Sequence, residues 1–244
     1  MNICILGRGI LADAVAHCCA VHFEVDRMVK SGHDAVWVCH DTTTSASGEP
    51  NMPGIIQTIV KALRPVPKTS LVIISSQLRV GTMKAIEAMR PDLRFVYVPE
   101  NVRVATARDD FHRQARIIVG RRTPDDDAIL DTILNKFTET IILTDTETAE
   151  FCKTALNGFL ALQIAYANEL ATLCEKVGAD MTVVTRALLS DRRVSPLAPL
   201  RAGAPYAVGH LGREVFNLMT TANDGVRSNV PLIGSIAVSN NRQP

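Results

Sequence analysis

The sequence predicts an α/β fold, in which a Rossmann-like parallel sheet is followed by an all-helical central domain with a long spine helix. Short apolar runs alternate with helical patterns through the first half of the chain. A Gly-x-Gly turn follows the first of these runs directly. An apolar helical pattern of roughly thirty residues begins near residue 144. We therefore expect a reduced, Rossmann-like dinucleotide-binding domain over residues 1–143 and a helical domain over residues 144–244.

The composition supports a globular protein and excludes several classes of partner. The chain has 244 residues, of which 47% are hydrophobic, enough for a sizeable core. Its net charge of +1 gives no reason to expect nucleic acid or an anionic membrane as a partner. The six cysteines follow neither a disulfide-framework nor a zinc-site spacing, so no metal site is expected. With no signal-peptide pattern and no long uncharged apolar run, the sequence predicts a soluble cytoplasmic protein.

The first predicted strand, residues 2–6, leads into a glycine-rich turn. Gly7, Gly9 and Ala12 occupy the places of the G-x-G-x-x-G/A fingerprint. In that fingerprint the first glycine permits a tight turn, the second allows a pyrophosphate to approach, and the third position lets helix and strand pack closely. Arg8 either adds a phosphate contact or lies in solvent. The predicted cofactor-binding residues of this turn are Gly7, Arg8, Gly9, Ile10 and Leu11.

The helix after this turn is predicted to continue to about Lys30. A complete dinucleotide fold has a second strand that ends, about twenty residues on, in an acid for the adenosine ribose. Glu24 and Asp26 are near that distance, but Asp34 already begins the next apolar run, which leaves too few residues for a parallel crossover. We interpret both acids as exposed helix positions and expect the usual second and third strands to be missing.

The remaining elements of the first half predict a parallel, doubly wound sheet. The expected strands are residues 34–39, 70–75, 93–99, 116–119 and 140–143, and the expected helices are residues 53–63, 82–89 and 125–137. The loops that follow two of these strands are predicted to flank a nicotinamide, through Thr43, Ser76 and Gln77.

The long helix places two polar side chains on an otherwise apolar face. Lys153 and Asn157 lie four residues apart, so an ammonium and an amide project together. Because an unpaired ammonium is expensive to bury, the pair predicts a functional site. The alternative is an amphipathic helix from which Lys153 extends to water. A capping box of Thr144 and Glu147 is expected at the helix start, and Gly178 at its end.

Several separated segments, in collinear order, resemble the UDP-glucose/GDP-mannose dehydrogenase family. They are SSQLRVGT (75–82), VPENVRVATARDDF with RIIVG (98–120), EFCKTALNGFLALQIAYANE (150–169), VGADMTVVTRALLSDRR (177–193) and NNRQP (240–244). Members of this family oxidise the C6 alcohol of a nucleotide sugar to a carboxylate with two molecules of NAD. The resemblance implies NAD as cofactor and a homodimer formed through the helix of residues 144–177. Relative to the family, the sequence lacks counterparts of part of the cofactor fold and of the domain that grips the substrate nucleotide.

The resemblance also implies roles for individual residues. Lys153 corresponds to the lysine that binds substrate and stabilises an oxyanion, and Asn157 to its partner amide. Glu100 corresponds to a glutamate that orders water and substrate near the reacting carbon. His210 stands where the catalytic cysteine belongs, and Glu214 where an aspartate follows it.

The cysteine-to-histidine difference limits the chemistry. A thiolate can carry a second oxidation through a thioester, whereas imidazole suits proton transfer near neutral pH. The sequence therefore favours an NAD-dependent enzyme that moves one hydride between an alcohol and a carbonyl of a small, sugar-derived substrate. In this reading, His210 or Lys153 relays the proton and Asn157 holds the oxygen. The expected affinity for NAD is lower than in the family, because no acid reads the ribose.

Two alternatives remain open at this stage. One is a catalytically inactive relative that acts as a dimeric regulatory or assembly subunit. The other is a lyase-like or deaminase-like enzyme in which Lys153 is an amine nucleophile.

Overall fold

The computed structural model describes residues 1–46, 48–100, 102–123, 127–207, 211–223 and 230–242. The chain divides into two compact units, the first made of residues 1–43 and 51–153 and the second of residues 44–50 and 154–244. The boundary falls inside the long helix, between Lys153 and Thr154, so this helix contributes residues to both units.

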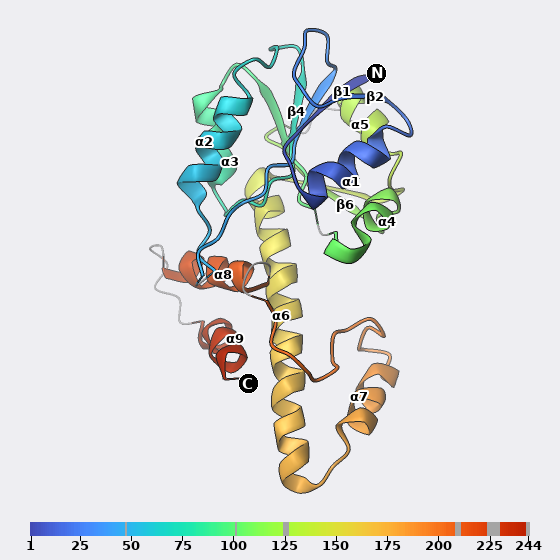
Figure 1. Ribbon diagram of the computed structural model, residues 1–244, viewed down its shortest axis with the longest axis vertical. Helices are drawn as coiled ribbons and strands as arrows, with labels where there is room; N and C mark the ends of the chain where they lie inside the picture. The colour runs from blue at the N-terminus through green and yellow to red at the C-terminus, as the bar shows by residue number, and fades with distance from the viewer. Residues whose placement is uncertain (47, 101, 124–126, 208–210, 224–229, 243–244) are drawn as a thin grey trace. The chain divides into compact units, whose positions relative to one another are not determined.

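The first unit is an α/β unit whose described residues form a seven-stranded sheet of order β2-β1-β3-β4-β5-β6-β7 (Figure 1). The strands are β1 (Asn2–Leu6), β2 (Glu24–Asp26), β3 (Ala35–Val38), β4 (Leu71–Ile74), β5 (Arg94–Tyr97), β6 (Ile117–Gly120) and β7 (Ile141–Thr144). Its helices are α1 (Ile10–Cys19), α2 (Met52–Ala62), α3 (Thr82–Met89), α4 (Ala107–His112) and α5 (Ala128–Leu134), with a 3-10 turn at Val104–Thr106. The predicted α/β class is confirmed.

Side chains along each strand alternate between two covered faces of this sheet. Ile3, Ile5 and Trp37 belong to a core cluster shared with α1, α4 and α5, whereas Cys4 and Val36 belong to a second cluster shared with α2 and α3 (Figure 1). Strands buried on both faces are continuous apolar runs in the sequence. These apolar runs made the positions of the strands predictable from the sequence.

The region after the first helix differs from the prediction. Helix α1 ends at Cys19 rather than near Lys30. Residues Glu24–Asp26 form β2, which pairs in parallel with β1 and places Asp26 opposite Cys4. A second strand is therefore present in shortened form, and its two acids are strand residues rather than exposed helix positions.

The short length of β2 explains why no crossover helix is needed between β2 and β3. β3 pairs with β1 on the side opposite β2, so the link must pass across β1. The link must cover two strand spacings across the sheet, about 10 Å. It must also run back along the length of the three-residue strand β2, about another 10 Å. Residues 27–34 span up to about 26 Å when extended, which is sufficient. No helix lies between β2 and β3, so the minimum length of a helical crossover does not apply to this link.

One strand pair departs from the predicted parallel sheet. β6 runs antiparallel to β5, with Tyr97 opposite Gly120, whereas the other pairs in the sheet are parallel. The apolar alternation of a strand is the same in either direction, so the pattern of residues alone did not reveal this reversal.

Helix α6 spans Thr146–Val177 and ends at Gly178, whose φ of 71° allows the backbone of residue 179 to bond back to the last turn. The predicted end of the helix is confirmed. Within the ranges that the structure describes, no helix combines the length and apolarity needed to cross a bilayer.

The start of α6 is capped differently from the prediction. The carboxylate of Asp145 accepts hydrogen bonds from the backbone N–H of Thr148 at 2.8 Å and from its hydroxyl at 2.6 Å. Glu147 instead forms an ion pair with Arg122 at 2.6 Å. The cap is therefore Asp145, and the predicted capping box of Thr144 and Glu147 is wrong.

The second unit is helical throughout its described elements. Besides its part of α6 it contains α7 (Met181–Ser190), α8 (Arg213–Asn223) and α9 (Pro231–Asn241). Its core cluster joins Ala161 of α6, Tyr206, Val215 of α8 and Ile236 of α9. The side chain of Asn240 accepts from the backbone N–H of Tyr206 at 2.8 Å and donates to its carbonyl at 3.3 Å. These bonds fix α9 to the segment before α8.

Candidate functional site

The glycine turn between β1 and α1 has the geometry of a phosphate cradle. Gly7 has a φ of 125°, and a Cβ there would lie 2.4 Å from the carbonyl oxygen of Cys39. Gly9, with a φ of 101°, has nothing within 4 Å of such a Cβ. No side chain in the described ranges caps α1, so the backbone N–H groups of its first turn are available to an anion. The turn therefore fits a pyrophosphate.

The ends of β3 and β4 supply a polar cluster next to this turn. The Thr42 hydroxyl donates to the carbonyl of Gln77 at 2.6 Å, and the Tyr97 hydroxyl donates to the carbonyl of Ser76 at 3.3 Å. Three side-chain atoms here are buried with no hydrogen-bond partner among the described residues, namely Nε2 of His40, Oγ of Ser76 and Oε1 of Gln77. Buried polar atoms without partners are costly, so this edge of the sheet fits a polar ligand.

The chemistry of His40 follows from its position. It comes two residues after β3, where β3 lies between β1 and β4, and burial lowers the pKa of its imidazole. The ring is therefore neutral at pH 7 and offers Nε2 to a ligand. Sequence reasoning predicted Ser76 and Gln77 but missed His40. The available signal was a histidine directly after a buried strand. Thr43, also predicted, is exposed, and its carbonyl accepts from the backbone of residue 51.

Lys153 and Glu100 are brought together within the first unit. The Lys153 side chain is 5% exposed, and its ammonium donates to the backbone carbonyl of Glu100, which follows β5. The Glu100 carboxylate is buried and accepts from the amide of Gln114 at 3.4 Å. The alternative in which Lys153 reaches water is wrong. Burial of the ammonium against a strand end holds a positive charge at the carboxyl edge of the sheet, on which the glycine turn also lies.

A buried carboxylate of α6, not singled out by the sequence, anchors the start of α3. Glu150 is fully buried, and its two oxygens accept from the backbone N–H groups of Gly81 at 2.6 Å and Met83 at 2.8 Å. Burial raises the pKa of Glu150 to about 7, although both backbone donors lower it. Desolvation of the charge therefore outweighs the stabilisation by the helix N-terminus.

Glu214 has its partners inside the second unit. Its Oε2 accepts from the Thr154 hydroxyl at 3.0 Å and from the Asn217 amide at 3.2 Å, and its Oε1 lies 3.4 Å from the Nε of Arg213. All four side chains are buried. This network joins α6 to α8 and gives Glu214 a structural task. Asn157 is half-buried on α6 in the same unit. His210 lies outside the described residues.

Among the described residues, no group of three or more His, Cys, Asp or Glu side chains is arranged to hold a metal ion. The site of the first unit thus consists of a phosphate cradle, buried polar atoms on the neutral imidazole of His40, on Ser76 and on Gln77, and the buried Lys153 ammonium. These groups fit a dinucleotide and a small polar substrate.

Family models match both parts of the chain. Residues 2–138 match the NAD binding domain of the UDP-glucose/GDP-mannose dehydrogenase family, and residues 147–242 match the central domain of that family. UDP-glucose 6-dehydrogenase of Rickettsia bellii is 30% identical over 192 residues, which cover 76% of this chain and 44% of the relative. UDP-glucose 6-dehydrogenase YwqF of Bacillus subtilis is 27% identical over 217 residues, covering 86% and 49%. The chain spans about half the length of the curated relatives it matches.

Solved structures share the fold. A UDP-glucose dehydrogenase from Pyrobaculum islandicum superposes with a TM-score of 0.81 at 17% identity, over 98% of this chain and 68% of that protein. The 3-hydroxyisobutyrate dehydrogenase of Mycobacterium tuberculosis, solved with L-serine, gives a TM-score of 0.70 at 17% identity, over 97% of this chain and 91% of that protein.

Proposed function

Because this chain belongs to the UDP-glucose/GDP-mannose dehydrogenase family, we propose that it is an NAD-dependent oxidoreductase that transfers one hydride between an alcohol and a carbonyl group. The proposed substrate is a small, sugar-derived compound. The N-terminal part of the chain matches the NAD binding domain of the family, and the glycine turn has the open cradle that a pyrophosphate needs. The observation that carries the proposal is the buried Lys153 ammonium at the carboxyl edge of the same sheet.

Different residues of the first unit bind the cofactor and the substrate. The backbone N–H groups at the start of α1 hold the pyrophosphate, and the buried polar atoms of His40, Ser76 and Gln77 orient the nicotinamide end. Lys153 has three N–H donors, and its bond to the Glu100 carbonyl fixes the ammonium in place. We propose that this ammonium also binds the substrate oxygen and stabilises the negative charge that develops there. When bound, NAD supplies the hydride acceptor for the alcohol carbon.

The restriction to one hydride rests on the sequence alone. The family nucleophile is a cysteine, and the loop of this chain places His210 at that position. Without a thiol no thioester forms, so the reaction stops at the carbonyl. The proposed roles of His210 as proton relay and of Asn157 as oxygen ligand follow from the resemblance.

Calorimetric titration of the full chain with NAD, with a thermal-shift measurement beside it, tests this function first. We expect binding heat and a rise in melting temperature. The absence of both effects at millimolar NAD would refute the proposed enzymatic activity. A panel of sugar alcohols and keto sugars is then screened for nicotinamide absorbance changes. Replacement of Lys153 by methionine is expected to abolish turnover and leave NAD binding within a few-fold. The control is Lys176→Met at the exposed end of α6. Two reduced cofactors per substrate would contradict the single transfer.

A second candidate, a dimeric subunit without catalysis, is favoured by one surface. Phe159, Tyr166 and Leu173 are spaced by seven residues on α6, and each is about half exposed. Side chains at this spacing form one stripe along a helix, as at helix–helix interfaces. The same stripe supports the homodimer that we propose for either function.

Sedimentation of the Tyr166→Glu variant tests the stripe, because a buried unpaired charge opposes association. The wild type is expected to sediment as a dimer and the variant as a monomer, with Glu169→Gln as the exposed control on the same helix. A wild-type monomer would contradict the dimer. A dimer that binds no dinucleotide would favour the subunit without catalysis.

A further inference from the structure

Asp26, the acid that ends β2, forms hydrogen bonds with residues of the link to β3. In dinucleotide folds the acid that ends the second strand accepts a hydrogen bond from the adenosine 2′-hydroxyl. Here that acid is Asp26, and its Oδ1 accepts from the Lys30 ammonium at 2.7 Å while its Oδ2 lies 3.0 Å from Nε2 of His33. The hydrogen bond from Lys30 and then that from His33 hold the pKa of Asp26 below its ordinary value. Both carboxylate oxygens are thus used by the link that leads to β3.

The next residue, Arg27, lies against the glycine turn instead. One terminal nitrogen of its guanidinium donates to the carbonyl of Gly7 at 2.8 Å. The other donates to the carbonyl of Ala12 at 3.2 Å and lies 3.3 Å from the carboxylate of Asp13. These contacts join the end of β2 to both sides of the turn. They hold a cation on the glycine turn, one residue after the acid that ends β2.

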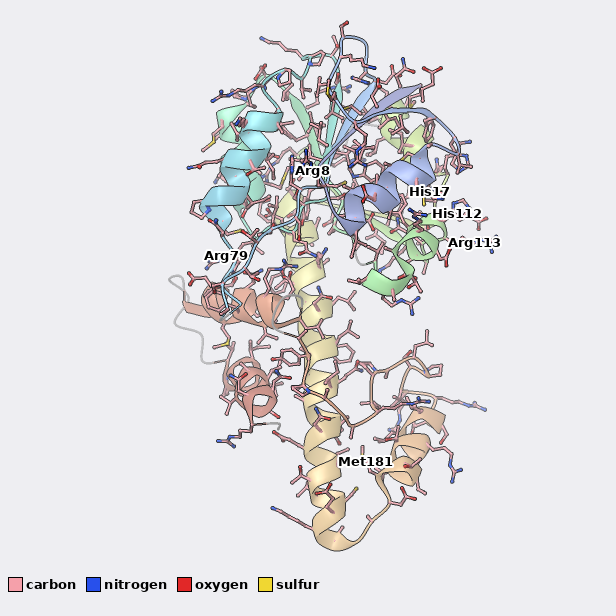
Figure 2. All side chains as sticks on the ribbon, in the orientation of Figure 1. Arg8, His17, Arg79, His112, Arg113 and Met181 are labelled. Carbon is pink, nitrogen blue, oxygen red and sulfur yellow. The ribbon has the colours of Figure 1, made fainter. Side chains whose placement is uncertain are left out.

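The Arg27 guanidinium retains capacity for a further ligand. Its side chain is 40% exposed, and the three contacts use only part of its five N–H donors. A second cation, Arg8, belongs to the glycine turn itself and is exposed (Figure 2). A planar guanidinium binds phosphate oxygens through paired hydrogen bonds, whereas a ribose hydroxyl is better read by a carboxylate.

We propose that the adenosine end of this site binds a 2′-phosphorylated dinucleotide at least as tightly as NAD, with Arg27 as the residue that pairs with the 2′-phosphate. The inference rests on the proposed function, because it concerns the cofactor of the same site. Three features of the described residues support it. Both oxygens of the usual acid are engaged by its own neighbours, a cation is fixed on the glycine turn, and the side chain of that cation is 40% exposed.

The matched probes are 2′,5′-ADP and 5′-AMP, which differ only in the 2′-phosphate. Each is titrated calorimetrically into the full chain at one ionic strength, together with NADP and NAD. We expect 2′,5′-ADP to bind about tenfold more tightly than 5′-AMP, the gain typical of a charge-assisted hydrogen bond. Arg27→Ala is expected to remove this difference and leave 5′-AMP unchanged. Arg27→Lys, which keeps the charge without the fork, is expected to retain part of it.

The control variant is Arg94→Ala. Arg94 is also a half-exposed arginine paired with an aspartate, at 3.0 Å from Asp127, but it begins β5 and so lies at the opposite edge of the sheet from the glycine turn. Its replacement is expected to change neither affinity. An equal loss in both variants would mean non-specific attraction and would overturn the assignment. The urea midpoint of each variant verifies that it is folded.

The remaining outcomes separate the inference from the function on which it rests. If 5′-AMP and NAD bind and the 2′-phosphate adds nothing, the inference is wrong and the proposed function stands. If Arg27→Ala tightens both nucleotides, the guanidinium blocks the site and the inference is again wrong. If none of the four ligands binds at millimolar concentration, the proposed function fails and the inference fails with it.

Discussion

Replacing Glu150 by glutamine is expected to change how the stability of the first unit depends on pH. This carboxylate is fully buried between α6 and the start of α3 and has a pKa of about 7 in the folded protein. An unfolded chain returns it to the ordinary value of 4.5. Between these values the folded protein keeps a proton that the unfolded chain has released. The stabilisation is therefore complete below pH 4.5 and is lost as the pH rises through 7.

The size of the effect follows from the two pKa values. The difference between 4.5 and about 7, at about 1.4 kcal/mol per pH unit, gives a loss of about 3 kcal/mol across the window. The glutamine variant cannot ionise, and its carbonyl oxygen accepts one of the two backbone bonds from Gly81 and Met83. Relative to the wild type, its free energy of unfolding should therefore increase by up to about 3 kcal/mol as the pH rises across this range.

Urea unfolding measured at several pH values tests this reasoning. The chain has a single tryptophan, Trp37, which is fully buried in the same unit as Glu150 and reports its unfolding by fluorescence. The matched control is Glu147→Gln, one turn earlier on α6. The hydrogen bond from Arg122 lowers the pKa of Glu147, so its charge in the folded protein changes mainly below the window. If the wild type and Glu150→Gln have parallel stability profiles between pH 4.5 and 7, burial does not raise this pKa and the reasoning is refuted.

Two further predictions concern the glycine turn and the network of the second unit. Gly7→Ala is expected to destabilise the protein by more than about 2 kcal/mol, because its Cβ would meet the carbonyl of Cys39 at 2.4 Å and its φ is positive. Gly9→Ala has open space and should cost only the backbone strain, about 1–2 kcal/mol, so equal urea midpoints for the two variants would contradict the clash. Thr154→Val removes the hydroxyl bonded to the Glu214 carboxylate and should cost about 1–3 kcal/mol. Hydrogen exchange should then be faster in α8, and unchanged protection there would show that the bond is not needed.

The fold was largely predictable because its signals are local. Strands buried on both faces are continuous apolar runs, and the glycine fingerprint and Gly178 each require a backbone conformation that few residues adopt. The errors in the sheet have one common cause. Strand direction at β6 and the existence of β2 depend on which segments pair in space, and no local pattern records that pairing.

The candidate site was predictable only in part, for a related reason. The residues of the glycine turn and Lys153 stood out by motif or by an unexpected charge on an apolar face. His40 and Glu150 carry no such mark, because a histidine or glutamate gains its importance from burial and from the atoms around it. Glu214 was named through the resemblance alone, and its catalytic role stays a prediction. Its contacts, which no sequence pattern indicated, join α6 to α8.

The sequence by itself determined the α/β class, the long helix, the glycine turn and the family to which the chain belongs. Tertiary structure alone decided that Asp26 pairs with Lys30 while Arg27 covers the turn, and that the Lys153 ammonium is buried on a strand end. The physical reason is the separation along the sequence over which the deciding interactions act. Helix periods, turns and apolar runs are set by residues a few positions apart. The direction of a charged side chain depends instead on groups that folding brings from distant segments, and on how much water it excludes there.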